Sequence, residues 1–386
     1  MKIDKDLAQQ IVDQTIEVLG RNINIMDKNG IIIGSGDKKR INTFHEIAAR
    51  VVKEGRTIEI CPEEAGKFYG VKPGINMPII FGDSIVGVVG ITGDPNEIRN
   101  YGKIVKNMVE LMLRQFFLMK EIEYKNDARN YFIRDLLDEN YKDIDSLVSR
   151  AQIYGFDLDV SRAVILIEIK NANENDLRNL EQSTEQMAGF FTSEDVVTPL
   201  SANKLVILKK QQEFFKPGAD FSWVYKIKEL LGNKLGAEVF IGIGNPYKGL
   251  EGIRSSYQEA SLVLKVISKL KDFYENGVAR VTDLGTDYVL PFIPPSVGWS
   301  IIKGLFGTME KAKEIFEDHK LARTFDYLMK SNLNVNQAAK RLFIHRNTLL
   351  YRLRVLEEKN GLNLQRCSDA FLFNFAYRLY RYLKGE

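Results

Sequence analysis

The stretch from Asn334 to Glu357 constrains this chain most, because it holds two short helical patterns separated by an abrupt break. The first pattern places apolar residues at helical spacing, at Val335, Ala338, Ala339 and Leu342. After the break at Phe343 and Ile344, the second pattern does the same at Leu349, Leu350, Leu353 and Leu356. Asn334 is suited to cap the first helix, with Gln337 three residues further on. Two short helices joined by a tight turn, the second one basic, predict a helix-turn-helix.

The second helix of this motif predicts which side chains would face DNA. Its leucines gather on one side when the sequence is turned by about 100° per residue. Arg, Asn and Thr side chains can bind base edges, and Arg also neutralises phosphate. Arg346 projects toward the core side, but at the start of the helix its long side chain can still reach a phosphate. The predicted DNA-binding residues are His345, Arg346, Asn347, Thr348, Tyr351 and Arg352.

Charge helps to separate this motif from the many amphipathic helix pairs that have a basic face and bind no DNA. Residues 319–386 contain 13 Lys and Arg against 5 Asp and Glu, a net charge of +8, while the whole chain carries +3. Residues 1–318 therefore carry −5. A basic module on an acidic body is typical of a protein that binds double-stranded DNA. A protein–protein adaptor that uses the basic helices for partners stays open as an alternative.

The length of 386 residues allows about two to four globular domains. No run approaches about 18 uninterrupted apolar residues, and the N-terminus opens into an amphipathic helix without a signal-peptide core. The two cysteines, Cys61 and Cys367, fall in different predicted domains, which fits a reducing cytoplasm. These cysteines and the three histidines are scattered without metal-site spacing. We therefore expect a cytoplasmic protein with no membrane contact, no metal and no cofactor.

Residues 1–100 combine helical segments with two hairpins. A capping-box pattern from Thr43 to Glu46 predicts a helix over Phe44–Lys53. Asp27-Lys-Asn-Gly30 and Gly82-Asp83 are turn sequences between apolar runs. The predicted strands are Ile23–Met26, Ile31–Ile33, Ile75–Phe81 and Ser84–Ile91. Short hairpins with helices on one face predict an α+β sensor domain of PAS-like type.

Residues 101–144 are predicted to form a helical connector. Apolar and amide side chains recur near heptad spacing at Ile104, Met108, Leu111, Met112, Gln115 and Phe116. This face could pair two protomers or pack on the sensor domain. We favour a homodimer contact, because a helix that leaves a sensor is a natural lever.

Residues 145–290 alternate strand and helix patterns, which predicts one α/β domain. The predicted strands are Ala163–Ile169, Lys204–Leu208 and Glu238–Gly244, and the predicted helices are Leu177–Phe191, Tyr225–Leu231 and Leu250–Ile267. Residues 291–386 are predicted to be all-α, with a helical linker followed by the helix-turn-helix. Basic residues along the last helix, Arg378, Arg381 and Lys384, are expected to be solvated or to touch phosphate.

Two parts of the chain resemble one known family. The run Phe343–Leu353, followed by Gly361-Leu-Asn-Leu364, is similar to the C-terminal helix-turn-helix of purine-catabolism and carbohydrate diacid regulators. Four N-terminal runs resemble the sugar-diacid recognition domain: Asp27–Ile32, Ser35–Glu46, Val71–Ile79 and Gly87–Pro95. The chain thus resembles the carbohydrate (sugar) diacid regulator family of bacterial transcription factors. Asn42 and Ile47 stand where glycines are expected in relatives, a departure that concerns the ligand more than the family.

The resemblance implies a multidomain transcriptional activator of sugar-acid utilisation genes that senses glucarate, galactarate or glycerate. It also implies that the middle domain is a degenerate GGDEF-like domain. The hairpin Pro199–Lys204 lacks the carboxylates and the glycine pair that cyclase chemistry needs, so we expect no enzyme activity. The alternative is a regulatory protein that binds a nucleotide or second messenger through this domain, although Gly242-Ile-Gly244 alone is weak support.

A site for a hydroxy acid needs converging cations and N–H donors. Arg40 offers a bidentate fork for a carboxylate, and the start of the helix near Thr43 offers free N–H groups. His45, Ser35 and Asn76 can bind hydroxyls, and Gly74 allows close approach of the backbone. The predicted ligand-binding residues are Ser35, Arg40, Thr43, His45, Gly74 and Asn76. Ordinary alternatives are a solvated Arg40, a buried and satisfied His45, and an Asn76 that shapes a turn.

Overall fold

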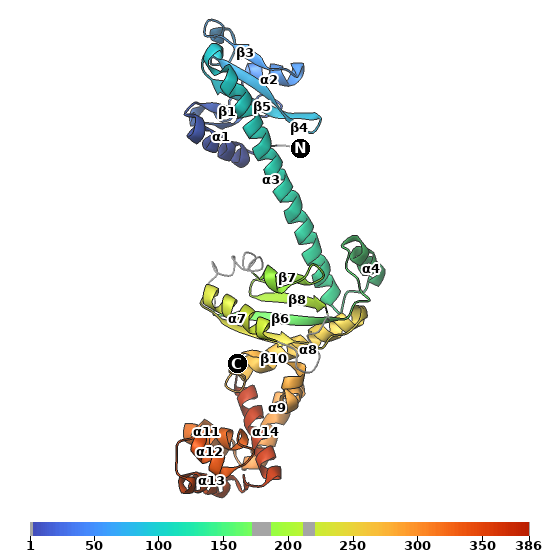
Figure 1. The fold of residues 1–386 in the computed structure, drawn as a ribbon, viewed down its shortest axis with the longest axis vertical. Helices are drawn as coiled ribbons and strands as arrows, with labels where there is room; N and C mark the ends of the chain where they lie inside the picture. The colour runs from blue at the N-terminus through green and yellow to red at the C-terminus, as the bar shows by residue number, and fades with distance from the viewer. Residues whose placement is uncertain (1–2, 172–186, 211–220, 386) are drawn as a thin grey trace. The chain divides into compact units, whose positions relative to one another are not determined.

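The computed structural model describes residues 3–171, 187–210 and 221–385. The chain forms two compact units, Met1–Asp127 and Ala128–Glu386, and helix α3 (Pro95–Leu137) contributes residues to both (Figure 1). Each unit combines a five-stranded sheet with helices, as expected for a multidomain α+β protein. No helix in the described ranges is long and apolar enough to cross a membrane.

The first unit is built on an antiparallel sheet with the strand order β2-β1-β5-β4-β3. Its strands are β1 (Ile23–Met26), β2 (Ile32–Ser35), β3 (Ile58–Ile60), β4 (Gly74–Phe81) and β5 (Ser84–Thr92). Both hairpins expected from the sequence are confirmed. Gly30 and Gly82 have φ angles of +80° and +58°, a left-handed conformation that glycine adopts without strain.

The two faces of this sheet are buried by different helices, because successive side chains of a strand point to opposite faces. Helices α1 (Lys5–Leu19) and α3 cover one face. Side chains buried together there include Leu7, Ile11, Ile25, Ile75, Met77, Val105 and Val109. Helix α2 (Glu46–Glu54) covers the other face. Its side chains Ile47, Ala48 and Val51 are buried together with Met26, Ile32 and Val88.

Helix α2 begins later than the sequence predicted. Its N-cap is His45, whose Nδ1 accepts a hydrogen bond from the Ala48 N–H at 3.2 Å. Thr43 does not cap it, because its Oγ1 already donates to the Arg40 carbonyl oxygen at 2.6 Å. The expected start at Phe44 and the capping role of Thr43 are therefore wrong. The free N–H groups belong to the turn that follows His45.

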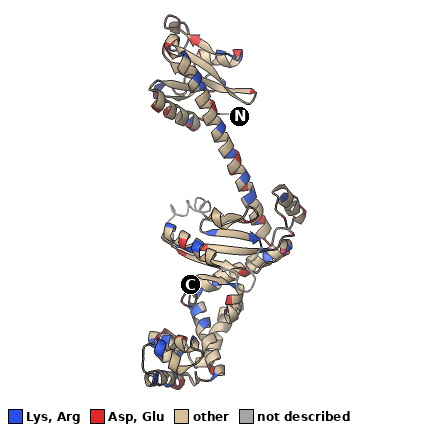
Figure 2. Ribbon diagram, in the orientation of Figure 1, with Lys and Arg blue, Asp and Glu red and all other residues tan. Residues whose placement is uncertain are grey.

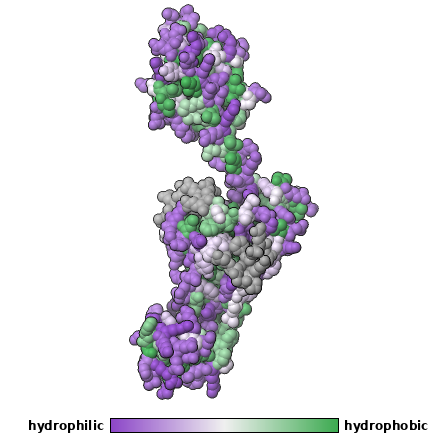
Figure 3. All heavy atoms as spheres, in the orientation of Figure 1, coloured by the Kyte–Doolittle hydropathy of each residue, from purple (hydrophilic) through white to green (hydrophobic). Residues whose placement is uncertain are grey.

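Helix α3 carries apolar side chains on two faces rather than one. Ile98, Val105, Val109 and Leu113 are fully buried against the sheet. Met112 and Phe116, which the sequence placed on a heptad stripe, pack against the same core. A second face stays exposed, and apolar side chains are visible on the surface of α3 in Figure 3. The exposed members are Tyr101, Ile104, Leu111, Leu118 and Ile122, and Met108 is half-buried. Together with the exposed Gln115, these positions alternate spacings of three and four residues.

The second unit contains a sheet with the strand order β10-β9-β6-β8-β7. Its strands are β6 (Arg162–Lys170), β7 (Val196–Ser201), β8 (Lys204–Lys210), β9 (Glu238–Ile243) and β10 (Val278–Arg280). Helix α8 (Gly249–Lys269) packs on one face and helix α7 (Ser222–Leu235) on the other, so the expected α/β organisation is confirmed. Most of the helix expected over Leu177–Phe191 lies outside the described residues, and the described part contains only the 3-10 turn Ala188–Phe190.

The C-terminal part is helical, as predicted, and it shares a core with the α/β part. Its helices are α9 (Pro295–Phe306), α10 (Met309–Glu317), α11 (His319–Met329), α12 (Val335–Arg341), α13 (Arg346–Asn360) and α14 (Cys367–Lys384). One continuous buried cluster includes Phe132 at the end of α3, Leu264 of α8 and Phe373 of α14. Helix α4 (Ile144–Ile153) adds Leu147 to the same cluster. The four domain boundaries expected from the sequence stay predictions.

Candidate DNA-binding and effector sites

Helices α12 and α13 form the helix-turn-helix that the sequence predicted. Asn334 caps α12 by accepting hydrogen bonds from the N–H groups of Asn336 and Gln337, both at 3.0 Å. The tight turn needs a left-handed residue, and Phe343 supplies it with a φ angle of +54°. Leu349, Leu353 and Leu356 bury the inner face of α13, as their spacing required. His345 caps α13 by accepting a hydrogen bond from the Asn347 N–H at 3.3 Å.

Five of the six predicted DNA-binding residues are exposed at the start and outer face of α13. These are His345, Arg346, Asn347, Thr348 and Tyr351. The sixth, Arg352, is half-buried and donates from Nη1 to Thr324 Oγ1 of α11 at 3.2 Å. Arg352 therefore holds α13 against α11 in this structure.

The basic residues of the C-terminal part differ in whether they form ion pairs. Arg378, Arg381 and Lys384 of α14 form ion pairs with Asp287, Asp272 and Glu317. Lys384 is exposed, as expected, whereas Arg378 is largely buried against Asp287, which corrects the expectation for that residue. These pairs join α14 to the α/β part and to α10. Lys340, Arg346 and Arg354 are exposed and have no ion pair within the described ranges. Figure 2 shows Lys and Arg on the helices of this part. Exposed cations without an ion pair among the described residues thus lie on α12 and α13, and Lys303, Lys320 and Arg323 add further ones on α9 and α11.

Sequence reasoning missed Phe343 at this surface. Its side chain is 96% exposed, and it lies in the turn between α12 and α13. The signal was present as a bulky residue at a break between two helical patterns, a position that favours glycine or asparagine.

The predicted effector residues in the first unit lie on the α2 side of the sheet. Ser35 and Asn76 are buried there, on β2 and β4. The Ser35 hydroxyl donates to Asn24 Oδ1 at 2.7 Å and accepts from the Asp37 N–H at 3.0 Å. Asn24 was not predicted from the sequence. Nothing local marks it, because its place depends on pairing between distant strands.

Arg40 and His45 form the charged end of this region. Arg40 is half-buried, and its Nη2 donates to the Gly70 carbonyl oxygen at 2.5 Å. It has no ion pair with any described carboxylate, and burial lowers the pKa of its guanidinium despite the opposing charge of Asp37. Burial, and then the charge of Arg40, lower the pKa of His45 to about 4. His45 is therefore neutral at pH 7, and since Nδ1 accepts from Ala48, Nε2 carries the proton and can donate.

Thr43 and Gly74 have local structural roles. Thr43 is exposed and its hydroxyl is engaged by the Arg40 carbonyl oxygen. A Cβ at Gly74 would lie 2.3 Å from the carbonyl oxygen of Ile91, so the glycine permits strand packing. Ser35, Arg40, His45 and Asn76 thus stay the stronger candidates among the predicted ligand-binding residues.

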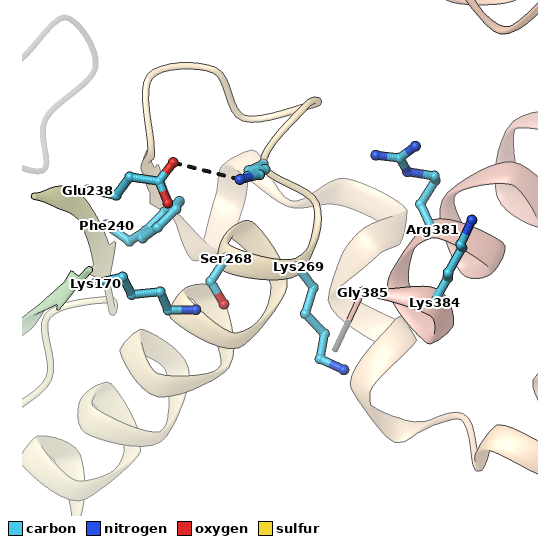
Figure 4. Close-up of a pocket in the computed structure, with 9 residues that line it drawn as sticks. Lys170, Glu238, Phe240, Ser268, Lys269, Arg381, Lys384 and Gly385 are labelled. Carbon is cyan, nitrogen blue, oxygen red and sulfur yellow. Dashed lines mark ion pairs between the residues drawn. The ribbon is translucent and has the colours of Figure 1, made fainter. Parts of the chain in front are cut away.

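A cavity of about 560 Å³ lies in the second unit, between the sheet and the end of α14. Figure 4 shows Lys170 and Lys269 on one side of this cavity and Arg381 and Lys384 on the other. Most of its cations already have acidic partners. Lys170 lies 3.6 Å from Glu168, and Lys271 lies 3.7 Å from Glu238. The charge here largely serves contacts within the unit. Among the described residues, no group of His, Cys, Asp and Glu could hold a metal ion.

Family models match the chain in three successive segments. The model for sugar diacid recognition matches residues 3–136, and that for the GGDEF-like domain matches residues 138–266. The model for the C-terminal helix-turn-helix domain of PucR matches residues 321–379. The GGDEF-like middle domain and the C-terminal DNA-binding domain expected from the sequence are therefore confirmed.

Whole-chain relatives lead to the same family. The chain is 30% identical to the carbohydrate diacid regulator of Escherichia coli over 98% of both chains. It is 23% identical to the proline-responsive transcriptional activator PutR of Bacillus subtilis, over 52% of this chain and 49% of PutR. A solved regulator of polyketide synthase expression from Bifidobacterium adolescentis covers 66% of this chain and 98% of its own with 15% identity, and its TM-score of 0.26 is too low to define a shared fold. From the full-length match and the order of its three domains, this chain belongs to the carbohydrate diacid regulator family of transcription regulators.

Proposed function

We propose that this protein is a cytoplasmic activator of sugar-acid utilisation genes, and that its first unit binds glucarate, galactarate or glycerate. The main support for this effector site is the half-buried Arg40, which has no ion pair with a described carboxylate and lies near the neutral His45. A half-buried guanidinium without a carboxylate at ion-pair distance favours an anionic ligand, because a carboxylate would restore the interactions that burial removed. The relative in Escherichia coli is named as a carbohydrate diacid regulator, which supports an organic acid as that anion.

The first unit would sense this acid as a PAS-like domain. The strand order β2-β1-β5-β4-β3, with one helix-bearing segment inserted between β2 and β3, supports this fold assignment. The candidate ligand residues lie on the face that this inserted segment covers.

The working form is proposed to be a homodimer that pairs through the exposed face of α3. Its apolar side chains at Ile104, Leu111 and Leu118 are spaced by seven residues, and each is more than half exposed. An apolar face with heptad spacing packs against the same face of a second helix in a two-stranded coiled coil. A second copy of α3 is therefore the proposed partner for this face. A dimer would present two α13 helices to half-sites about one helical turn of DNA apart.

The proposal on the effector is tested by calorimetric titration of the full chain with galactarate, glucarate, glycerate and acetate. Selective binding of one hydroxy acid is expected, and Arg40→Ala should abolish it, because the carboxylate loses its cation. Arg56→Ala is the matched control, since Arg56 is an exposed arginine of the same unit. If the wild-type chain binds none of these hydroxy acids, the sugar-acid assignment is wrong.

The competing function is a nucleotide or second-messenger sensor that acts through the GGDEF-like domain. The cavity between the sheet and α14 is the feature that would serve it. The ion pairs of Lys170, Lys271, Arg381 and Lys384 weigh against it, because an incoming phosphate would compete with carboxylates already in place. We therefore propose a scaffold role without catalysis for this domain.

A further inference from the structure

A row of polar positions crosses the sheet of the first unit on the α2 side. Strand pairing sets Asn24 of β1 opposite Ser35 of β2 and opposite Gly90 of β5. It also sets Gly90 opposite Asn76 of β4. Directly paired residues of an antiparallel sheet point to the same face. Ser35, Asn24, Gly90 and Asn76 therefore lie side by side on one face, in this order.

The neighbouring row on the same face shows how unusual these polar residues are. Met26 and Val88 lie two positions along from Asn24 and Gly90, and both are buried with α2 in an apolar cluster. A polar row next to such a cluster costs free energy unless its groups are paired. The polar groups of this row therefore need hydrogen-bond partners.

The two carboxamides in this row lack those partners within the part of the chain that the structure describes. Asn24 and Asn76 are each only 3% exposed. Asn24 Oδ1 accepts from the Ser35 hydroxyl, but its Nδ2 has no described hydrogen-bond partner. The Asn76 carboxamide has none at either atom. Buried amides of this kind are normally satisfied by protein, water or ligand.

Gly90 leaves room on this face for the Asn76 carboxamide. A Cβ at this position would lie 2.8 Å from Asn76 Oδ1 and 3.4 Å from Met26 Cε. Gly90 is not in a left-handed conformation, so backbone strain does not explain the glycine. The Asn76 carboxamide occupies the place that a side chain at Gly90 would need.

One end of the row leads to the charged group already described. Ser35 accepts from the Asp37 N–H, and the Asp37 carbonyl oxygen accepts from the Arg40 N–H at 2.9 Å. Lys72, 3.5 Å from Asp37, adds a second cation from another loop. These hydrogen bonds join Ser35, at one end of the polar row, to the turn that carries Arg40.

We propose that the carboxamides of Asn24 and Asn76, on either side of Gly90, bind the hydroxyl groups of the effector. The site would then select polyhydroxylated acids over acids of the same carbon skeleton that lack hydroxyls. This inference rests on the proposed sugar-acid function and adds the basis of its selectivity. A hydroxyl both donates and accepts, which matches amides that each offer an N–H₂ and a carbonyl oxygen. An analogue without hydroxyls leaves these buried groups unpaired and binds more weakly.

The test compares matched acids by calorimetry on the full-length chain: galactarate with adipate, which is the same six-carbon diacid without hydroxyls, and glycerate with propionate. We expect the hydroxylated member of the binding pair to bind roughly tenfold to hundredfold more tightly. Asn24→Ala should reduce this ratio to within about threefold. Arg40→Ala should instead weaken both members of the pair. Asn22→Ala is the control, because the Asn22 amide already donates to Thr92 Oγ1 at the ends of β1 and β5.

Each outcome separates the two levels of the proposal. If the hydroxylated acid binds and its deoxy analogue binds equally well, the hydroxyl-binding row is wrong while the effector assignment stands. If no acid binds to the wild type, both are wrong. The ratio of the affinities for the hydroxylated acid and its deoxy analogue can be measured in the wild-type chain even if Asn24→Ala fails to fold. Gly90→Ala is a second variant. Its added methyl should displace the Asn76 amide and lower the ratio, and an unchanged ratio in a folded Gly90→Ala chain would contradict the proposal.

Discussion

Arg254 of α8 donates a hydrogen bond from Nε to the main-chain carbonyl oxygen of Leu136, in the last turn of α3, at 3.1 Å. The arginine is buried, and its Nη2 also donates to the carbonyl oxygen of Tyr141 at 3.4 Å. A cation here satisfies carbonyl groups that a helix leaves without partners at its C-terminus. These hydrogen bonds attach the C-terminal end of α3 to the GGDEF-like domain. A movement of α3 would therefore be passed to that domain at Arg254.

Replacing Arg254 with methionine should destabilise the second unit by about 2 kcal/mol, because buried carbonyl groups lose charged donors. It should also reduce the effect of a bound acid on DNA affinity. Urea unfolding measures the first effect, and DNA titration with and without the acid measures the second. Lys265→Met, on an exposed position of the same helix, is the control. An Arg254→Met chain with wild-type stability would mean that this anchor is dispensable.

Replacing Arg346 or Asn347 with alanine should weaken binding to a specific DNA duplex, each by about 1–3 kcal/mol. Both side chains are exposed in the first turn of α13, the end of the helix that is proposed to contact DNA. If Arg346 contacts phosphate, its loss should also lower the slope of log affinity against log salt by about one. Fluorescence anisotropy at several salt concentrations measures both, with the exposed Lys226→Ala of α7 as control. Unchanged binding by both α13 variants would place the reading surface elsewhere.

The stability of the first unit should fall between pH 6.5 and pH 4 because of His45. The folded-state pKa is about 4 and the unfolded value is 6.5, so the unfolded state binds the proton first as the pH drops. Stability from this group is present above pH 6.5 and is lost as the pH falls toward 4, by roughly 3 kcal/mol in all. Asparagine caps helices without titrating. In His45→Asn the pH dependence of urea unfolding in this window should shrink, and an equally steep profile would exclude His45 as its cause.

Charging the exposed face of α3 should dissociate the proposed homodimer. Two carboxylates at Leu111 and Leu118, introduced by Leu111→Glu with Leu118→Glu, would be buried in a coiled coil and repel their counterparts. Sedimentation should then give a monomer with a folded first unit, because both side chains lie away from its core. Asn107→Glu adds charge at another exposed position of the same helix and should leave the dimer intact. A dimer that survives the double substitution pairs through another surface.

Local patterns in the sequence predicted the helices and hairpins well, and contacts between distant residues explain where prediction stopped. The spacing of Leu349, Leu353 and Leu356 predicted the buried face of α13, because helical periodicity is a local property. The pattern around Thr43 predicted the wrong N-cap for α2. The Thr43 hydroxyl instead donates a hydrogen bond to the Arg40 carbonyl oxygen, which the pattern could not show. The role of Arg378 was hidden for the same reason, as its partner Asp287 is 91 residues away in the chain.

The candidate effector site follows the same division. Chemistry alone selected Arg40, His45, Ser35 and Asn76, because cations and amides suit a hydroxy acid. Asn24 escaped notice, since its place beside Ser35 and Gly90 follows from the register of three strands. Strand register depends on which apolar residues share a core, which a single sequence does not display.

The proposal that acid binding controls DNA binding is tested most directly by measuring DNA affinity in the presence and in the absence of the acid. A duplex selected by the wild-type chain from random sequences is titrated by fluorescence anisotropy, with and without the hydroxy acid that binds the first unit. We expect the acid to change DNA affinity by about fivefold or more. Arg40→Ala should abolish this change while the DNA affinity without acid stays as in the wild type. An acid that binds at Arg40 and leaves DNA affinity and the activation of a reporter gene unchanged would contradict this proposal.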